Sequence, residues 1–101
     1  MFYIYILRSE SIDKYYVGYS ENPWRRVTQH NENEKIKFTG KYNNWKLVAT
    51  FEVSEDRSIA MKLEKFIKKQ KSRKLLELLI DPNFIPSNSL AQMIRVPHLR
   101  D

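Results

Sequence analysis

Two tyrosines, an arginine, a histidine and a glutamate are spaced so that simple secondary structure would bring them together. Tyr5 and Tyr16 lie in two segments rich in Tyr, Ile and Val, which is typical of paired strands. Arg26 and His30 are four residues apart and would share one face of a helix. Glu64 falls at the border of the apolar stripe of a later predicted helix. Such a set could handle a phosphate group and a proton.

The hydrolysis of a phosphodiester bond needs side chains of these kinds. It requires a base that activates water, cations that stabilise the charge developing on the phosphoryl oxygens, and usually a divalent metal beside the leaving oxygen. The five side chains supply each part. A single carboxylate such as Glu64 can hold Mg²⁺ if water and phosphate oxygens complete the octahedron, which is common for that ion.

Each of these residues also has a structural explanation when it is taken alone. The two tyrosines can pack a half-buried strand face, and Arg26 can be a surface residue of its helix. His30 near a helix C-terminus is commonly a cation that favours the helix dipole. Glu64 can pair with Lys68 at i and i+4, and Gly18 can serve the close approach of a backbone or ligand. Residue types and periodicity alone therefore predict a basic α+β domain with a suggestive cluster.

The first two strands are predicted to form a hairpin, because a polar stretch separates two segments of high β propensity. If Arg8 pairs with Asp13, the same register places Tyr5 opposite Tyr16. The predicted strands span residues 2–8 and 15–20.

The first helix is predicted to begin at Pro23, because Asn22 can accept hydrogen bonds from the helix N-terminus and Pro is tolerated at the first helical position. It runs to about Asn31, and the Asn- and Lys-rich residues 31–44 form a polar loop. A third strand follows from Trp45 to Val53. We expect its alternating apolar side chains to share one face, namely Leu47, Ala49, Phe51 and Val53.

A second helix is predicted over about residues 55–70, with Ser54 as its N-cap and two acidic residues in its first turn. Its buried stripe consists of Ile59, Leu63, Phe66 and Ile67. A further amphipathic helix of a turn or two runs from Arg73 to Ile80. The chain is therefore expected to be an α+β domain with a small three-stranded antiparallel sheet flanked by helices.

The end of the chain is predicted to be an irregular tail. Prolines at positions 82, 86 and 97 oppose long regular structure. We expect the tail to pack partly on the domain through Phe84, Leu90 and Met93. The predicted organisation is one domain over residues 1–80 and a tail over residues 81–101.

Composition bounds the setting and the partners. The net charge of +6 favours a polyanionic partner, with nucleic acid ahead of a membrane surface. No window approaches the roughly 18 apolar residues of a membrane span, and no signal peptide is recognisable. The chain has no cysteine, so disulfides, thiolate zinc sites and a cysteine nucleophile are excluded. A cytoplasmic location is therefore expected.

The cluster resembles the GIY-YIG nuclease family, whose name records two short strand motifs with a tyrosine in each. The motifs stand here as Tyr3-Ile4-Tyr5 and Tyr16-Val17-Gly18. The family has an Arg ten residues after the second tyrosine and commonly a His or Tyr four residues later, and these positions match Arg26 and His30. Its metal-binding Glu, inside a helix after a third strand, matches Glu64. The similarity covers roughly residues 2–80 and looks closest to small stand-alone bacterial members related to the nuclease domain of the excision-repair protein UvrC.

The resemblance implies a metal-dependent endonuclease that hydrolyses phosphodiester bonds, with DNA ahead of RNA as the substrate and a link to DNA repair. Tyr5 would be the general base, Tyr16 would support the water or phosphate, and Arg26 would neutralise the phosphoryl oxygens. His30 would orient groups or relay protons, and Glu64 would hold Mg²⁺ or Mn²⁺. A tyrosine with a pKa near 10 serves as a base only if neighbouring positive charge lowers that pKa.

Two departures from the family pattern concern a Gly and an Asn. Tyr3 replaces the first Gly, which is frequent in the stand-alone group. The late Asn of several family endonucleases has no clear counterpart, so its role is either unfilled or supplied by Lys37, Thr39 or Lys41. The predicted nucleic-acid-binding residues are Lys37, Lys41, Lys65, Lys68 and Lys69.

Two other readings remain open at this stage. The first is a non-catalytic module that binds DNA or RNA phosphates through the basic segment from Lys62 to Lys74, in which seven cations face one acid. Salt-sensitive binding without cleavage would indicate such a module. The second is a partner-docking domain whose tail, from about Leu90, packs on another subunit. A dimer that is lost when residues 85–101 are deleted would favour it.

Overall fold

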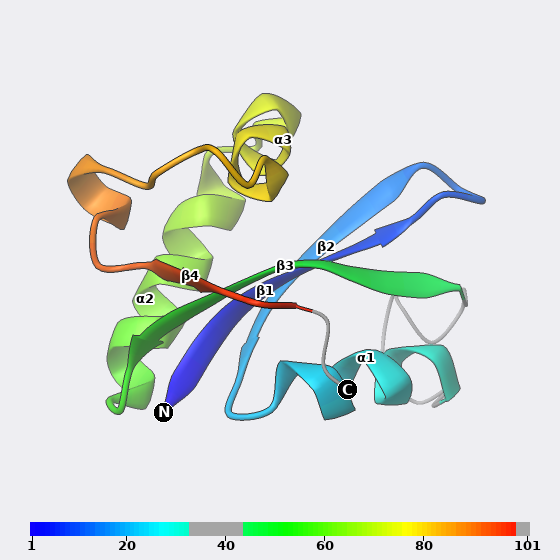
Figure 1. Ribbon diagram of the computed structural model, residues 1–101, viewed down its shortest axis with the longest axis horizontal. Helices are drawn as coiled ribbons and strands as arrows, with labels where there is room; N and C mark the ends of the chain where they lie inside the picture. Colours follow the sequence, from blue (N-terminus) through cyan, green and yellow to red (C-terminus); the bar gives the residue numbers. More distant parts are fainter. Residues whose placement is uncertain (33–43, 99–101) are drawn as a thin grey trace.

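The computed structural model describes residues 1–32 and 44–98. It contains strands, α-helices and one short 3₁₀ helix, which follow one another along the chain as shown in Figure 1. In chain order they are β1 (Phe2–Ser9), β2 (Lys14–Ser20), α1 (Pro23–Glu32), β3 (Trp45–Ser54), α2 (Arg57–Lys69), α3 (Arg73–Ile80), the 3₁₀ helix η1 (Asn88–Leu90) and β4 (Ile94–Val96).

The strands form one antiparallel sheet in the order β2-β1-β3-β4. The α+β class is confirmed, but the prediction of three strands is wrong by one. The fourth strand comes from the tail, where Ile94 pairs with Glu52 and Val96 pairs with Thr50. Three residues carry too little alternation to indicate a strand in the sequence, and Pro97 prevents the strand from continuing.

The register of the β1–β2 hairpin differs from the predicted one. Tyr5 lies opposite Gly18, and Tyr16 lies opposite Leu7. Arg8 does contact Asp13, but through a side-chain ion pair of 2.8 Å and not as a register partner. The slip amounts to two residues, and side chains alternate with a period of two, so the two tyrosines still share one face of the sheet.

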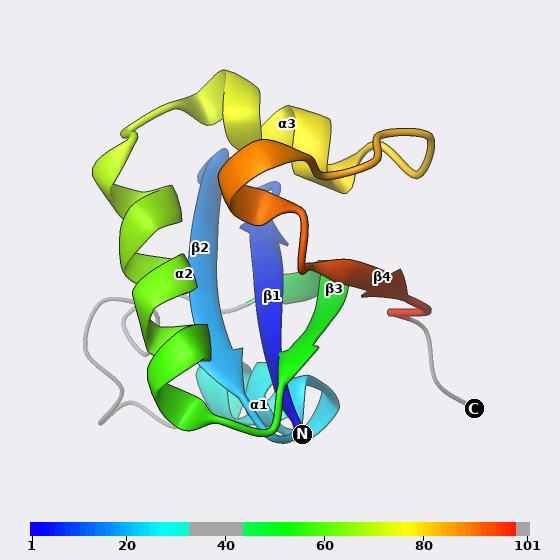
Figure 2. The ribbon, with the colours of Figure 1, turned by 90° about the vertical axis from the view of Figure 1, so that its left-hand side faces the viewer.

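The sheet has a hydrophobic core on each face. Figures 1 and 2 show α1 on one side of the sheet and α2 with α3 on the other. The larger core lies under α2 and α3 and includes Ile4, Ile6, Ala49, Phe51, Leu63, Ile67 and Leu79. The smaller core contains Tyr5, Leu7 and Trp45, and α1 covers it through Val27.

The predicted apolar face of β3 is wrong at one residue, Leu47. Leu47 packs in the smaller core, whereas Ala49, Phe51 and Val53 face the larger one. A register shift between Ile6 and Leu7 of β1 indicates a β-bulge at this point. A bulge adds one residue to a strand, so it reverses the alternation beyond it.

The helix starts follow the capping residues in the sequence. Asn22 Oδ1 accepts a hydrogen bond of 3.0 Å from the backbone N–H of Arg25, which agrees with the predicted start of α1. Ser72 caps α3, whose predicted bounds are confirmed. The predicted N-cap of α2 is wrong, because Asp56 and not Ser54 accepts a hydrogen bond of 2.8 Å from the N–H of Ser58.

The tail packs on the larger core. Leu90 and Met93 are buried there, and Phe84 contacts the same cluster, as the sequence predicted. Arg95 donates hydrogen bonds to the carbonyl oxygens of Leu79 and Asp81, at 2.6 and 2.8 Å. Within residues 1–32 and 44–98, no helix has the length and apolar character needed to cross a membrane.

Candidate active site

Side chains from four elements meet in a pocket of about 280 Å³ beside β2. Tyr5 comes from β1, Arg26 from α1, and Glu64 from α2. The pocket contains four of the five predicted catalytic residues, and it is lined by Tyr5, Tyr16, Gly18, Tyr19, Arg26, Arg57 and Glu64.

The position of β2 explains how these side chains can meet. Among residues 1–32 and 44–98, β2 is an edge strand, and no further described strand covers its outer side. Tyr16 belongs to the face covered by α1, whereas Tyr19 packs with the core under α2. Groups from both faces can therefore meet around the free edge of β2. This arrangement brings Glu64 of α2 close to tyrosines that lie on the opposite face.

The side chain of Tyr5 is held in place by a hydrogen bond with His30. The Tyr5 hydroxyl and His30 Nε2 are 3.1 Å apart and form a hydrogen bond between two buried side chains. The tautomer of His30 decides which of the two groups donates. His30 is the predicted catalytic residue that does not line the pocket. Its contact with Tyr5 places it one layer further in, where it can orient the Tyr5 ring.

Gly18 makes room for the Tyr5 ring. A β-carbon at position 18 would lie 2.6 Å from both the Cζ atom and the hydroxyl oxygen of Tyr5. No other residue type fits there unless the buried Tyr5 side chain moves. The glycine of the second motif thus serves the close packing of the tyrosine of the first motif.

Tyr16 packs against the same histidine, with the two rings tilted by 57°. Its ring centroid lies 4.7 Å from that of His30 and 6.4 Å from that of Tyr5. On its other side, Lys68 Nζ lies 5.3 Å from the centre of the Tyr16 ring. Tyr16 is therefore packed between α1 and α2 at the edge of the pocket.

The electrostatics of the pair Tyr5 and His30 follow from their burial. Burial raises the pKa of Tyr5, the nearby Tyr16 raises it further, and Arg26 opposes the rise through its charge and a hydrogen bond. Burial also lowers the pKa of His30 to about 4, and the charge of Arg26 acts in the same direction. His30 is thus neutral at neutral pH, and its explanation as a cation at the end of a helix does not hold.

The family comparison agrees with this geometry. The model of the GIY-YIG catalytic domain matches residues 1–76. The chain belongs to the GIY-YIG family. This is a family of endonucleases, which act on nucleic acid. No curated protein and no solved structure gave a significant match to the chain.

Glu64 is the residue that the sequence predicted as a metal ligand. It is the one carboxylate among the residues that line the pocket, and its side chain is 15% exposed. It also forms an ion pair of 3.0 Å with Lys68, so its structural explanation as an i, i+4 partner is confirmed as well. The described part of the chain contains no group of three or more acidic, His or Cys side chains able to hold a metal.

The pocket contains two residues that the sequence pattern does not single out. Arg57 Nε donates a hydrogen bond of 3.3 Å to the Tyr19 hydroxyl, and both residues line the pocket. The sequence does contain a signal that could have identified Arg57, because Arg57 precedes Glu64 by seven residues. That distance is about two helical turns, so the two side chains share a helix face.

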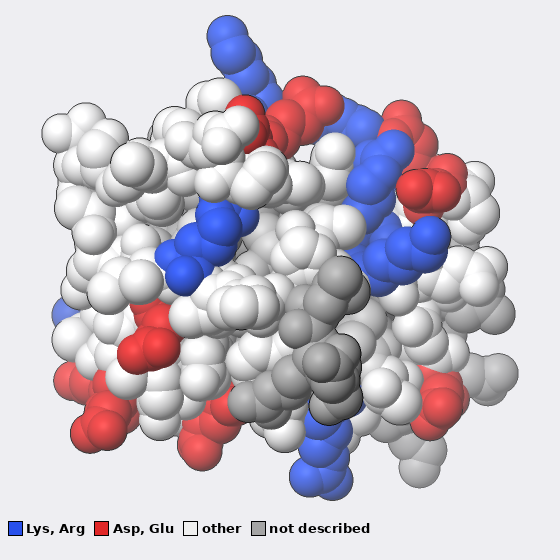
Figure 3. Space-filling model, in the orientation of Figure 1, with Lys and Arg blue, Asp and Glu red and all other residues white. Residues whose placement is uncertain are grey.

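The predicted nucleic-acid-binding lysines are distributed around this site. Lys68 contacts Tyr16 and Glu64, whereas Lys65 and Lys69 are exposed on α2 and do not line the pocket. Lys37 and Lys41, with Thr39, lie outside the described residues. On the face shown in Figure 3, cationic and acidic side chains are interspersed, so charge alone does not mark a binding surface on that face.

Proposed function

We propose that the chain is a metal-dependent endonuclease that hydrolyses phosphodiester bonds, with DNA as its substrate. One observation carries the proposal. Tyr5, Tyr16, Arg26 and Glu64 come from four elements and line one pocket. The set combines a proton-transfer group, a cation and a metal-binding carboxylate, which are the parts that in-line hydrolysis requires.

Each residue has a role in this proposal. Arg26 neutralises the phosphoryl oxygens, and Tyr16 positions the attacking water or the phosphate. Tyr5, in its deprotonated form, accepts the proton of that water as general base. His30 is a positioning residue, because it contacts the Tyr5 hydroxyl at 3.1 Å and does not line the pocket. Arg57 adds a second cation to the pocket.

The pKa of Tyr5 limits when it can act as a base. Burial raises this pKa above its ordinary value, so Tyr5 keeps its proton at neutral pH in the free protein. Arg26 already opposes the rise, and further positive charge in the pocket would lower the pKa again. We infer that Tyr5 becomes a base only when the pocket contains substrate and a cation.

The donor chemistry of the pocket fits Mg²⁺ or Mn²⁺. Glu64 offers one carboxylate, and these ions are commonly held by one or two carboxylates together with water and substrate phosphate oxygens. When bound, such an ion stabilises charge on the leaving oxygen as a Lewis acid. Binding it requires Glu64 to share or leave its ion pair with Lys68.

A non-catalytic nucleic-acid-binding module is the second candidate. Two observations favour it. The raised pKa of Tyr5 keeps the proposed base protonated, and the ion pair with Lys68 occupies the carboxylate of Glu64 that catalysis requires. In this case the pocket would hold a phosphate without cleaving it. Binding would weaken steeply with salt.

A cleavage assay with matched variants separates the two candidates. Labelled DNA and RNA strands, duplexes and junctions are incubated with Mg²⁺, with Mn²⁺ or with a chelator. Wild type is compared with Glu64→Gln, which keeps the shape but removes the charge, and with Glu77→Gln. Glu77 is an exposed acid on α3 outside the pocket, so it is the matched control.

We expect metal-dependent cutting by wild type and by Glu77→Gln, and a loss of at least about a hundredfold in Glu64→Gln, since metal-ligand contacts contribute several kcal/mol. Binding without cutting in all three proteins would instead establish the binding module. The relative rates on DNA and RNA decide the substrate class.

The finer placement within the family is also a proposal. Tyr3 in place of the first Gly of the motif supports the small stand-alone bacterial group related to UvrC, and with it a role in DNA repair. The absence of cysteine supports a cytoplasmic location. A fusion to a fluorescent protein, imaged in cells, tests the location directly.

A further inference from the structure

A second and larger pocket continues from the active site along β2. Its volume is about 470 Å³, and it lies between the first half of β2 and the turn that joins α2 to α3. Tyr16 lines both pockets. We call this second pocket the β2 groove. Figure 2 shows α2 running beside β2, with α3 lying across the end at which β2 begins.

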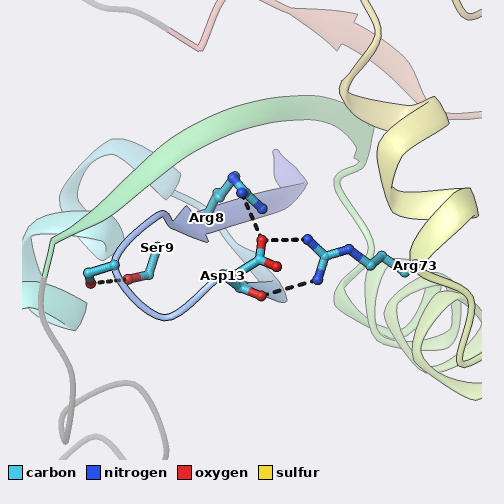
Figure 4. A network of polar contacts seen from close by, with 5 residues as sticks. Arg8, Ser9, Asp13 and Arg73 are labelled. Atoms are coloured by element: carbon cyan, nitrogen blue, oxygen red, sulfur yellow. Dashed lines mark hydrogen bonds and ion pairs between the residues drawn. The ribbon is translucent and has the colours of Figure 1, made fainter.

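The outer end of the β2 groove is fixed by a clamp between the hairpin and α3. Asp13 Oδ1 accepts hydrogen bonds from Arg8 Nη2 at 2.8 Å and from Arg73 Nη2 at 2.6 Å, as Figure 4 shows. Arg73 Nη1 also donates to the carbonyl oxygen of Asp13 at 3.1 Å. The Tyr15 ring lies 4.9 Å from each of the two guanidinium groups. These contacts join the β1–β2 hairpin to α3 at this end of the groove.

The lining of the β2 groove combines cations with apolar side chains. Four cations and one carboxylate line it, and the carboxylate already has two arginine partners. The cations are Lys14, Lys68, Lys71 and Arg73. Val17, Ile67 and Leu76 form an apolar wall. Such a surface suits a ligand with negative charge on one side and a flat apolar body on the other.

The order of residues along β2 shows that the two pockets are consecutive. Tyr19 and Gly18 line the active-site pocket, Tyr16 lines both, and Val17, Tyr15 and Lys14 line the groove. Successive strand residues are about 3.3 Å apart, so the groove begins within a few ångströms of the catalytic tyrosines. A chain molecule bound in one pocket therefore extends directly into the other.

We propose that the β2 groove binds one unpaired nucleotide next to the scissile phosphate. The inference rests on the proposed function, which puts that phosphate in the active-site pocket. The neighbouring phosphate contacts the lysines, and the base packs against the apolar wall, as single-stranded nucleic acids do on aromatic and apolar surfaces.

The size of the groove argues that this nucleotide is unpaired. A volume of about 470 Å³ is in the range of sites for small ligands, and it matches one nucleotide better than a base pair with its second strand. A nucleotide from a duplex must leave its stack to enter, which costs least where it is already mismatched or single-stranded. The enzyme should therefore prefer single strands, flaps or distorted duplexes over perfect duplex.

Binding to matched oligonucleotides tests the groove without relying on cleavage. A fluorescent single-stranded DNA and the same sequence in a perfect duplex are titrated in the presence of a chelator. Lys71→Asn removes a groove cation and suits the positive φ of 49° at this position, which Asn tolerates. Leu76→Trp fills the groove. Lys46→Gln removes an exposed cation on β3 outside both pockets and is the control. Circular dichroism and thermal melting verify the fold of each variant.

For Lys71→Asn we expect about threefold to tenfold weaker binding of the single strand and a salt dependence reduced by about one phosphate contact. Leu76→Trp should also weaken single-strand binding. Duplex binding should stay unchanged in both variants, and Lys46→Gln should behave as wild type. An equal loss in Lys71→Asn and Lys46→Gln, wild-type affinity in both groove variants, or no binding by wild type would overturn the proposal.

The outcomes also separate the groove from the proposed nuclease activity. If the variants change single-strand binding but no substrate is cut with any metal, the groove stands and the nuclease fails. If wild type cuts and the groove variants bind and cut like wild type, the nuclease stands and the groove fails.

Discussion

The hydroxyl of Tyr5 lies 3.1 Å from Nε2 of His30, and both side chains are buried. A strand tyrosine of the first motif is thereby fixed by a helix residue that lies 25 positions later in the chain. The contact removes rotational freedom from the hydroxyl of Tyr5, a residue that lines the pocket beside β2. Pre-organised groups of this kind are what catalysis by positioning requires.

The variant Tyr5→Phe should abolish cleavage and retain nucleic-acid binding. It removes the proposed proton acceptor and leaves the ring that packs against Gly18. One buried hydrogen bond is lost, so the free energy of unfolding should fall by only about 1–2 kcal/mol. Cleavage rates and oligonucleotide affinity are the measurements. Tyr3→Phe, which removes a hydroxyl outside the pocket, is the control. Full activity in Tyr5→Phe would remove Tyr5 from the mechanism.

The variant Gly18→Ala should reduce activity through Tyr5. The added methyl group would lie 2.6 Å from the ring and hydroxyl of Tyr5, so the tyrosine must shift, which disturbs its contact with His30. Overpacking of this kind costs about 1–3 kcal/mol of stability. A displacement of about 1 Å in a catalytic group can cost about a hundredfold in rate. Urea denaturation and cleavage rates measure the two effects. A variant with normal rates would show that Tyr5 does not need its present position.

The helices were predictable because they carry local signals. Asn22 before Pro23 marks the start of α1, and the spacing of apolar residues indicates α2 and α3, although the N-cap of α2 lies two residues later than predicted. The site residues Tyr5 and Tyr16 could be placed on one face because a register error of two residues preserves the face.

Features that depend on distant parts of the chain were not predictable in this way. The strand Ile94–Val96 exists because the tail can pair with β3, and that pairing leaves no pattern in three residues. Tyr19 and Arg57 enter the active-site pocket because α2 runs beside the free edge of β2, which only the assembled sheet determines. The bulge that turns Leu47 to the smaller core depends likewise on pairing with β1.

The buried His30 should make the fold less stable in mild acid. Its pKa in the folded protein is about 4, below its ordinary value of 6.5, because burial and Arg26 disfavour the charged form. The unfolded chain therefore binds the proton more tightly, and the free energy of unfolding falls as the pH drops from about 6.5 to about 4. The difference between the two pKa values corresponds to a loss of about 3 kcal/mol in the free energy of unfolding.

Urea midpoints measured across this pH range check the prediction. In His30→Gln the slope of stability against pH between 6.5 and 4 should become shallower, because the titrating group is gone. An NMR titration that gives His30 a pKa near 6.5 in the folded protein would contradict it.

The variant Arg57→Gln should slow cleavage and leave the fold intact. Arg57 lies in the pocket with the Tyr19 hydroxyl, where it can contact a phosphoryl oxygen. A lost charge-assisted hydrogen bond is worth about 1.5–3 kcal/mol, so the rate should fall by about tenfold or more. Arg25→Gln removes an exposed arginine of α1 that does not line the pocket and should cut at the wild-type rate. Equal rates in the two variants would place Arg57 outside the site.

The variant Arg95→Ala should loosen the tail from the domain. Arg95 Nη2 donates to the carbonyl oxygens of Leu79 and Asp81, and the guanidinium lies 4.7 Å from the centre of the Phe51 ring. These contacts join β4 to the end of α3, so their loss should lower the free energy of unfolding by about 2 kcal/mol. Arg95→Lys keeps the charge but not the forked geometry, so its free energy of unfolding should lie between those of wild type and Arg95→Ala.

Limited proteolysis and urea denaturation measure this effect, and they also test the predicted division at residue 80. Leu90 and Met93 are 6% and 3% exposed, so residues 1–80 alone would uncover part of the larger core. We therefore expect a protein truncated after residue 80 to be less stable than Arg95→Ala, because it loses the buried apolar side chains as well as the hydrogen bonds. Wild-type stability in the truncated protein would show that the tail is an independent segment and that β4 contributes nothing to the sheet.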